Sequence, residues 1–254
     1  MSGKGSREAR REERLRAESE GEGEERRKRL LQIGSAAGFL VVAAVLVLIV
    51  LSASDTSGGD TSLEDVGLVN RELRGIPQSG MVLGDPQAKV KLTEFGDLKC
   101  PVCKGFSEEI IPDVIDSKVR SGEAKIEFKN YTIIDRESSA AGAAAIAAGE
   151  QGRAWSFIEL FYRNQGLETA SYVTDEFLTE IARGAGVEDI GKWNEARKSK
   201  LVLGLVQRAT EEAEKLGFTG TPSFGVEGPG TKGMETLGTP GSVGAIEAAI
   251  EDAG

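Results

Sequence analysis

The chain has 254 residues, a length that is enough for one sizeable domain with appendages, and its formal net charge is −10. The acidic balance argues against nucleic acid as a partner. No histidine is present, which excludes Ser-His-Asp and Cys-His catalysis and any metal site with an imidazole ligand.

Residues 1–32 form a charged segment with almost no apolar side chains. Such a segment cannot bury a core, so we expect a disordered cytoplasmic tail. A tail that binds a partner is the alternative interpretation.

Residues 33–52 form the predicted transmembrane anchor. No residue from Leu30 to Ser54 is charged, and a helix needs ~20 apolar residues to cross a bilayer. Basic residues at 26–29 precede the span and acidic residues follow it, so we expect the N-terminus in the cytoplasm and residues 55–254 outside. The alternative is a signal peptide cleaved near 52–54, but its apolar region is usually only ~7–15 residues long. Both interpretations deliver the domain to an oxidising compartment.

A linker is predicted for residues 53–78, and a single domain for residues 79–254. A turn leads into the first strand, which we expect at 88–95. Apolar and charged residues alternate over 124–129 and predict a second, half-buried strand. A strand, a helix and another strand with a long crossover imply that the two strands pair in parallel.

Helical periodicity continues from about 137 to 216, which is too long for a single crossover. We therefore expect a helical subdomain inserted into a sheet fold, with Trp155 and Trp193 in its core rather than at a ligand. Pro112 should interrupt the helix that follows the first strand, because proline removes one backbone hydrogen bond. A hairpin is predicted at 225–237, with a final amphipathic helix after it.

The two cysteines of the chain, Cys100 and Cys103, lie between the first strand and its helix. Pro101 falls at the first helical position, where its missing N–H costs nothing. Cys100 is then at the helix N-terminus, where free N–H groups and the helix dipole favour thiolate. Cys103 lies one turn further on the same face, within reach of a disulfide. This arrangement is typical of thiol–disulfide exchange.

A zinc site and a structural disulfide are the two other interpretations of the cysteines. A zinc site needs two more ligands, and the chain has no other cysteine and no histidine. A purely structural disulfide would close so short a loop that it would constrain the unfolded chain little. We expect redox chemistry with no metal and no cofactor.

These motifs, in this order and spacing, resemble the DsbA-like branch of the thioredoxin superfamily, especially its membrane-anchored bacterial members. The resemblance runs from about Pro77 to the C-terminus. It rests on Gly84-Asp85-Pro86, Glu94-Phe95-Gly96-Asp97, Cys100-Pro101-Val102-Cys103, Glu150-Gln151-Gly152 with Trp155, and Gly217-Phe218-Thr219-Gly220-Thr221-Pro222-Ser223-Phe224.

The resemblance implies an α/β fold, a thioredoxin fold with an inserted helical subdomain, preceded here by one transmembrane helix. Pro222 would match the cis-proline beside the redox-active disulfide, and Thr221 the residue whose backbone pairs with substrate peptide. Glu94 would match a buried acid near the cysteines and is a candidate proton relay. Val102 stands where well-known oxidases carry histidine, so we expect a less stabilised thiolate and a less oxidising disulfide. Lys99 and Lys104 are expected to add positive potential at the thiolate, but only a little, because the charge of exposed lysines is screened.

The predicted function is that of an extracytoplasmic thiol–disulfide oxidoreductase, which forms disulfides in exported proteins through Cys100 and Cys103. By resemblance, a membrane quinone-linked partner would regenerate the disulfide. Alternatives are a reductase or isomerase, a redox partner dedicated to one client pathway such as cytochrome maturation, and a binding or chaperone-like module with a structural disulfide.

Overall fold

The computed structural model describes residues 63–254. The predicted tail, the predicted anchor and the first part of the predicted linker lie outside these residues. Within the described part, every helix is too short or too polar to cross a bilayer.

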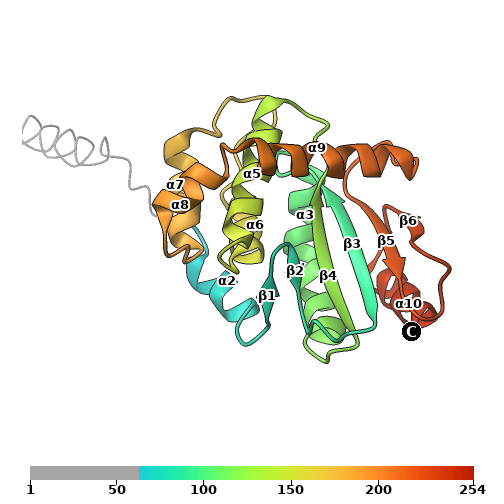
Figure 1. Ribbon diagram of the computed structural model, residues 1–254. Coiled ribbons are helices and arrows are strands. Elements are labelled where there is room, and N and C mark those ends of the chain that lie inside the picture. Colours follow the sequence, from blue (N-terminus) through green and yellow to red (C-terminus); the bar gives the residue numbers. More distant parts are fainter. Residues whose placement is uncertain (1–62) are drawn as a thin grey trace, which may run out of the picture. The chain divides into compact units, whose positions relative to one another are not determined.

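A six-stranded sheet with the order β1-β2-β4-β3-β5-β6 forms the centre of the described domain (Figure 1). Its strands are β1 (Gln78–Ser79), β2 (Val82–Leu83), β3 (Val90–Gly96), β4 (Ala124–Asn130), β5 (Ser223–Glu227) and β6 (Glu235–Gly238). β3 pairs with β4 in parallel, as predicted, and all other neighbouring strands are antiparallel.

The two central strands differ in burial because they have different neighbours. In β4, buried and half-buried residues alternate along the whole strand, as the sequence pattern predicted. In β3, nearly every residue is buried, because β3 lies between β4 and β5 and is covered on both faces. Leu92 belongs to the main core, whereas Phe95 points to the opposite face and joins a small cluster with Phe218.

The helix after β3 is broken into three pieces. These are α3 (Pro101–Glu109), α4 (Ile111–Val114) and a π-helix at Ile115–Val119. Pro112 lies in the first turn of α4, where its missing N–H is tolerated. The predicted interruption is confirmed.

Five helices lie between β4 and β5 in the sequence and make up the helical insertion. They are α5 (Arg136–Gly149), α6 (Ala154–Arg163), α7 (Asp175–Gly184), α8 (Ile190–Ala196) and α9 (Lys200–Lys215). Side chains cap several N-termini; Asp135, for example, accepts hydrogen bonds from the backbone of Glu137 and Ser138. Trp155 and Trp193 are fully buried, and each indole donates to a backbone carbonyl, so both are core residues as predicted.

The second half of the predicted linker is folded structure instead. Residues Val66–Glu72 form α2, which packs against α6. Val69 and Leu73 recur at helical spacing and are buried, and Arg163 binds Glu72 at 2.6 Å. The first part of residues 53–78 is polar, and for that reason the whole segment was predicted to be a linker, although its second part carries an apolar helical stripe.

The C-terminal segment forms the predicted hairpin and helix. β5 and β6 pair with a register shift at Phe224 and Gly225. The N-cap of α10 (Val243–Ala253) is Ser242, whose side chain accepts a hydrogen bond from the Ala245 N–H. α10 packs against α4, β3 and β5, so the end of the chain closes the core.

Candidate active site

The loop between β3 and α3 carries the first cysteine. Cys100 is the N-cap of α3, and Pro101 occupies the first helical turn. The Cys100 N–H donates to the Asp97 carbonyl at 2.9 Å, and the Cys100 carbonyl accepts from Lys104 N–H at 3.1 Å. The sulfur is therefore placed at the helix end that carries free N–H groups, as predicted.

The two cysteines are free thiols, and their pKa values are shifted in opposite directions. A hydrogen bond from the Cys103 thiol, helped by Thr221 and by backbone N–H groups of Cys103 and Val102, outweighs burial and lowers the pKa of Cys100 to about 6. Burial, together with the negative charge on Cys100, raises the pKa of Cys103 well above its usual value. Near neutral pH, Cys100 is mainly thiolate and Cys103 is the proton donor.

The loop before β5 approaches Cys100 from the other side. The Thr221 carbonyl oxygen lies 3.5 Å from Cys100 Sγ and accepts the thiol proton when Cys100 is protonated. The peptide bond between Thr221 and Pro222 is cis. Thr239, the residue after β6, donates from its Oγ1 to the Pro222 carbonyl at 2.7 Å and so holds the loop in place. The structure thus brings together Cys100, Cys103, Thr221 and Pro222 from two distant parts of the sequence.

Glu94 is buried within β3, with 2% of its surface exposed. Burial is the main cause that raises its pKa to about 8, and the negative charges of Glu159 and Cys100 act in the same direction. Its Oε1 has no hydrogen-bond partner among the described residues. Glu94 therefore does not face solvent, as the resemblance implied.

A second carboxyl group near the site, that of Glu159 on α6, is also buried. The sequence did not predict it as a site residue. Burial raises its pKa to about 7, while Ser107 of α3 donates to its Oε2 at 2.8 Å. Tyr162, one turn further along α6, donates to the Asp97 carbonyl at 3.4 Å. The available signal was a glutamate on the aromatic face of a helix, four residues after Trp155 and three before Tyr162.

Lys99 is not exposed, which corrects the prediction. Its side chain is 1% exposed, and its ammonium group binds Asp135 at 2.6 Å and Glu137 at 3.2 Å. Burial opposes the charge on Lys99, but these two carboxylates outweigh it and raise the pKa of Lys99 above 10.5. Lys104 is half-exposed and lies 3.7 Å from Glu108.

Comparison with known proteins shows the family to which this chain belongs. The family described as Thioredoxin matches residues 77–243. The chain belongs to the thioredoxin family. The probable disulfide bond formation protein D of Bacillus anthracis is 30% identical over 149 residues, which cover 58% of this chain and 69% of that protein. The disulfide bond formation protein D of Bacillus subtilis is 26% identical over 145 residues, or 56% and 65% of the two chains.

Solved structures support the same fold. Oxidised BdbD from Bacillus subtilis superposes with a TM-score of 0.61 at 23% identity, covering 70% of this chain and 95% of that one. Wolbachia pipientis alpha-DsbA1 superposes with a TM-score of 0.55 at 19% identity, covering 71% and 91%. Taken with the disulfide-forming relatives, this DsbA-like fold identifies the chain as a thiol:disulfide oxidoreductase.

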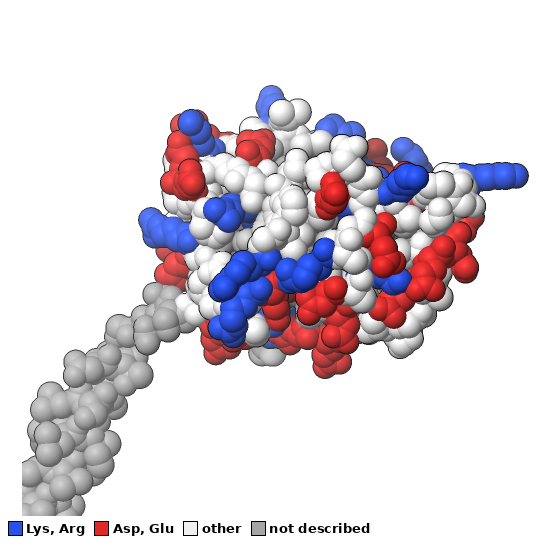
Figure 2. Space-filling model, turned by 90° about the horizontal axis from the view of Figure 1, so that it is seen from below, with Lys and Arg blue, Asp and Glu red and all other residues white. Residues whose placement is uncertain are grey.

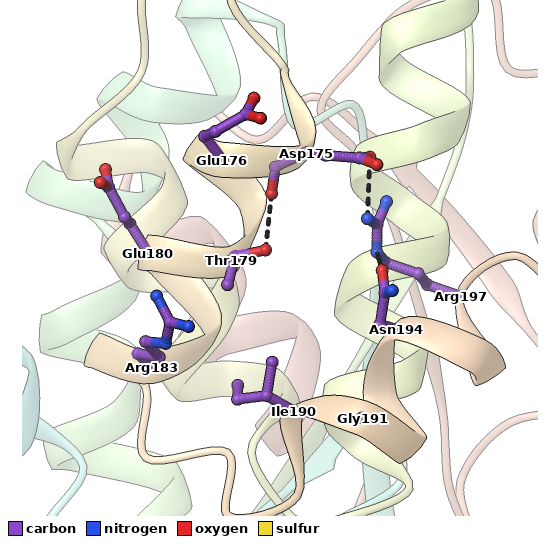
Figure 3. A pocket seen from close by; sticks show the side chains of 9 residues that line it. All are labelled: Asp175, Glu176, Thr179, Glu180, Arg183, Ile190, Gly191, Asn194 and Arg197. Atoms are coloured by element: carbon purple, nitrogen blue, oxygen red, sulfur yellow. Dashed lines mark hydrogen bonds and ion pairs between the residues drawn. The ribbon is translucent and has the colours of Figure 1, made fainter.

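Outside the cysteine site, the surface of this thioredoxin-family domain has a polar hollow and mixed charged side chains. A hollow of about 410 Å³ lies between α7 and α8, away from the sulfurs (Figure 3). One of its carboxylates, that of Asp175, binds Arg197 and Lys198, both at 2.8 Å. On the face seen from below, acidic and basic side chains lie beside one another (Figure 2). Among residues 63–254, no three Cys, Asp or Glu side chains gather in a way that could hold a metal ion.

Proposed function

We propose that this oxidoreductase forms disulfides in exported proteins outside the cytoplasmic membrane, with Cys100 as the exchanging sulfur and Cys103 as its partner. The observation that supports this most strongly is the opposite acidity of the two thiols across one helical turn. A pKa of about 6 for Cys100 gives a nucleophile and a good leaving group at neutral pH.

The reaction starts from the Cys100–Cys103 disulfide. A substrate thiolate attacks the Cys100 sulfur, forming a substrate–Cys100 bond and breaking the bond to Cys103. Cys103 leaves with the electron pair and takes up a proton. A second substrate thiolate then attacks the substrate sulfur of the mixed disulfide, and Cys100 leaves as thiolate. The substrate loses two electrons and the enzyme gains them.

Glu94 is the proposed proton donor to Cys103. Its buried carboxyl group keeps its proton to about pH 8, and Cys103 gains basicity from burial when its bond to Cys100 breaks. A proton from Glu94 keeps the Cys103 sulfur neutral after its bond to Cys100 breaks; the negative charge then lies on the Glu94 carboxylate, which takes up a proton again before the next cycle.

Substrate peptide is proposed to bind along the loop before β5. The Thr221 carbonyl faces Cys100, so a cysteine-containing peptide that pairs with this loop brings its sulfur to the Cys100 sulfur. The family resemblance assigns the same role to Thr221 and Pro222. Thr239 and Ser223 support the loop through hydrogen bonds to the carbonyls of Pro222 and Gly220.

The cellular location rests on the uncharged span at 33–52. Basic residues before it and acidic residues after it favour a cytoplasmic tail and an extracytoplasmic domain. In that compartment, a membrane quinone-linked protein is the proposed oxidant that regenerates the disulfide. Fusion of a topology reporter at either end of the span would test the orientation.

Alkylation of the reduced chain with iodoacetamide, followed by mass spectrometry, tests the assignment of the sulfurs. We expect labelling at Cys100 with a rate midpoint near pH 6. Preferential labelling of Cys103 would contradict it. Equilibration with graded glutathione buffers then gives the direction: a potential toward ~−120 to −180 mV supports oxidation, and one at or below ~−270 mV makes the enzyme a reductant.

A further inference from the structure

The loop that carries Cys100 is tied to the start of the helical insertion by a buried carboxylate. Asp97 is fully buried. Its Oδ1 accepts the N–H of Lys99 at 2.9 Å, and its Oδ2 accepts the N–H groups of Ile133 at 2.9 Å and Ile134 at 3.2 Å. One side chain thus joins the Cys100 loop to the segment between β4 and α5.

Lys99 makes a second tie in the same region. Its ammonium group donates to Asp135 at 2.6 Å, to Glu137 at 3.2 Å and to the Ala170 carbonyl at 3.2 Å. It also lies 5.5 Å from the centre of the Tyr172 ring. An ammonium group buried to this degree is stable only while these partners surround it, so the residue before Cys100 is held firmly.

Gln165, in the segment after α6, makes a third tie. Its side-chain amide donates to the Leu98 carbonyl at 2.8 Å and to the Cys100 carbonyl at 3.2 Å. These two carbonyls flank Lys99. The backbone of the loop is thereby held from the insertion on both sides of the lysine.

We propose that Lys99 and Gln165 are positioning residues for the exchange reaction, which hold Cys100 at the N-terminus of α3 from the helical insertion. The inference rests on the proposed role of Cys100 as the exchanging sulfur. Neither residue touches the sulfur; each acts through the backbone of the loop.

Position matters because the stabilisation of a thiolate by N–H groups is short-ranged. Hydrogen bonds weaken steeply as distance and angle depart from their optimum. When the loop shifts, the Cys100 sulfur moves away from the N–H groups of Val102 and Cys103 that stabilise its charge. Loss of either tie is therefore expected to raise the pH at which Cys100 becomes reactive.

Lys118 offers a matched control. Its side chain is 10% exposed, and its ammonium group also binds two carboxylates, Glu123 at 2.9 Å and Glu251 at 2.7 Å. It lies in the π-helix after α4 and binds α10, away from the cysteine loop. The substitution Lys118→Met removes a comparable ionic cluster without touching any tie to Cys100.

The experiment measures the pH dependence of iodoacetamide alkylation for the full reduced chain and for Lys99→Met, Gln165→Leu and Lys118→Met. We expect Lys99→Met to slow alkylation at pH 5 by about tenfold and Gln165→Leu by about threefold, since one unit of pKa is tenfold in thiolate fraction. Lys118→Met should keep the wild-type midpoint. Urea unfolding of each variant reports stability separately.

Gln165→Leu is decisive because it changes no charge. A raised midpoint in Gln165→Leu, with Lys118→Met unchanged, supports positioning, and it does so even when Lys99→Met fails to fold. A wild-type midpoint in Gln165→Leu overturns the proposal, because a shift in Lys99→Met alone is then an effect of charge. Wild-type labelling at Cys103 would instead refute the proposed function, so the two failures are distinguishable.

Discussion

The sheet half of the domain and its helical insertion contribute to the same site in different ways. β3, α3 and the loop before β5 hold the atoms that we propose to react or to contact substrate: two sulfurs and the Thr221 carbonyl. The insertion supplies no reacting atom. It supplies the groups that surround these atoms, among them Glu159, Tyr162 and Gln165.

The groups proposed to react are placed by local backbone geometry, namely a cysteine N-cap followed by a proline in the first helical turn. The surrounding groups act through burial and hydrogen bonds, which vary with every packed side chain. Four substitutions test the division: three in the sheet half and one on α5 at the boundary.

The largest effect is expected for Cys100→Ser, which removes the reacting atom. Oxidation of a reduced two-thiol peptide, followed by thiol titration, should fall to the uncatalysed rate. Cys103→Ser is the matched variant, and it is offered oxidised glutathione instead of the reduced peptide. Its Cys100 thiolate attacks one glutathione sulfur and releases the other as thiolate, and without Cys103 the mixed disulfide cannot be resolved within the chain, so it should accumulate. Full activity of Cys100→Ser would mean that the disulfide is merely structural and that the chain acts as a binding module.

Gly142→Ala should loosen the boundary between the two halves. A Cβ at Gly142 of α5 would overlap the side-chain amide of buried Asn130 on β4. We expect a loss of about 2 kcal/mol in the free energy of unfolding, measured by urea denaturation. Gly105→Ala on α3 is the control, because a Cβ there meets nothing within 4 Å. The control should gain roughly 0.5–1 kcal/mol from helix propensity, and equal changes in both variants would contradict the packing argument.

Glu94→Gln should flatten the pH dependence of stability in the reduced protein, in which both cysteines are free thiols. The folded state holds the Glu94 proton to about pH 8, whereas the unfolded state loses it near pH 4.5. The unfolded state therefore binds fewer protons between these values, and the free energy of unfolding falls as pH rises, by at most about 1.4 kcal/mol per pH unit.

Urea unfolding at pH 5, 6 and 7 measures this slope. Glu159→Gln should remove a smaller part of it, since the pKa of Glu159 reaches only about 7. Slopes for Glu94→Gln that match those of the wild type would show that Glu94 is ionised in the folded protein.

Val102→His should give the smallest effect. Val102 is 52% exposed, so the fold tolerates the change. A histidine beside Cys100 can donate a hydrogen bond and carry positive charge, both of which stabilise thiolate. Each 1.4 kcal/mol of added stabilisation raises the reduction potential by about 30 mV. Glutathione equilibration measures the shift, with Val102→Leu as the control; a potential equal to that control would show that this position does not tune the site.

Local patterns accounted for much of the sheet half. The alternation over β4 identified its buried face, and Pro101 and Pro112 marked the starts of α3 and α4, because proline constrains the backbone wherever it stands. The same reasoning missed α2, whose apolar stripe follows a polar stretch. Helical periodicity located the insertion but said nothing of which helix face meets the cysteines.

The sequence by itself determined that the two sulfurs lie one helical turn apart at a helix start, because the spacing of the cysteines and Pro101 fix both features locally, and it predicted this pair as the redox centre. Only the tertiary structure decided that Lys99 is buried, that Glu159 lies beside Ser107, and that Gln165 holds the Cys100 loop. The partners of Lys99 and Gln165 lie 36 to 71 residues away in the chain. Burial and ionisation depend on such distant neighbours, and no local pattern contains them.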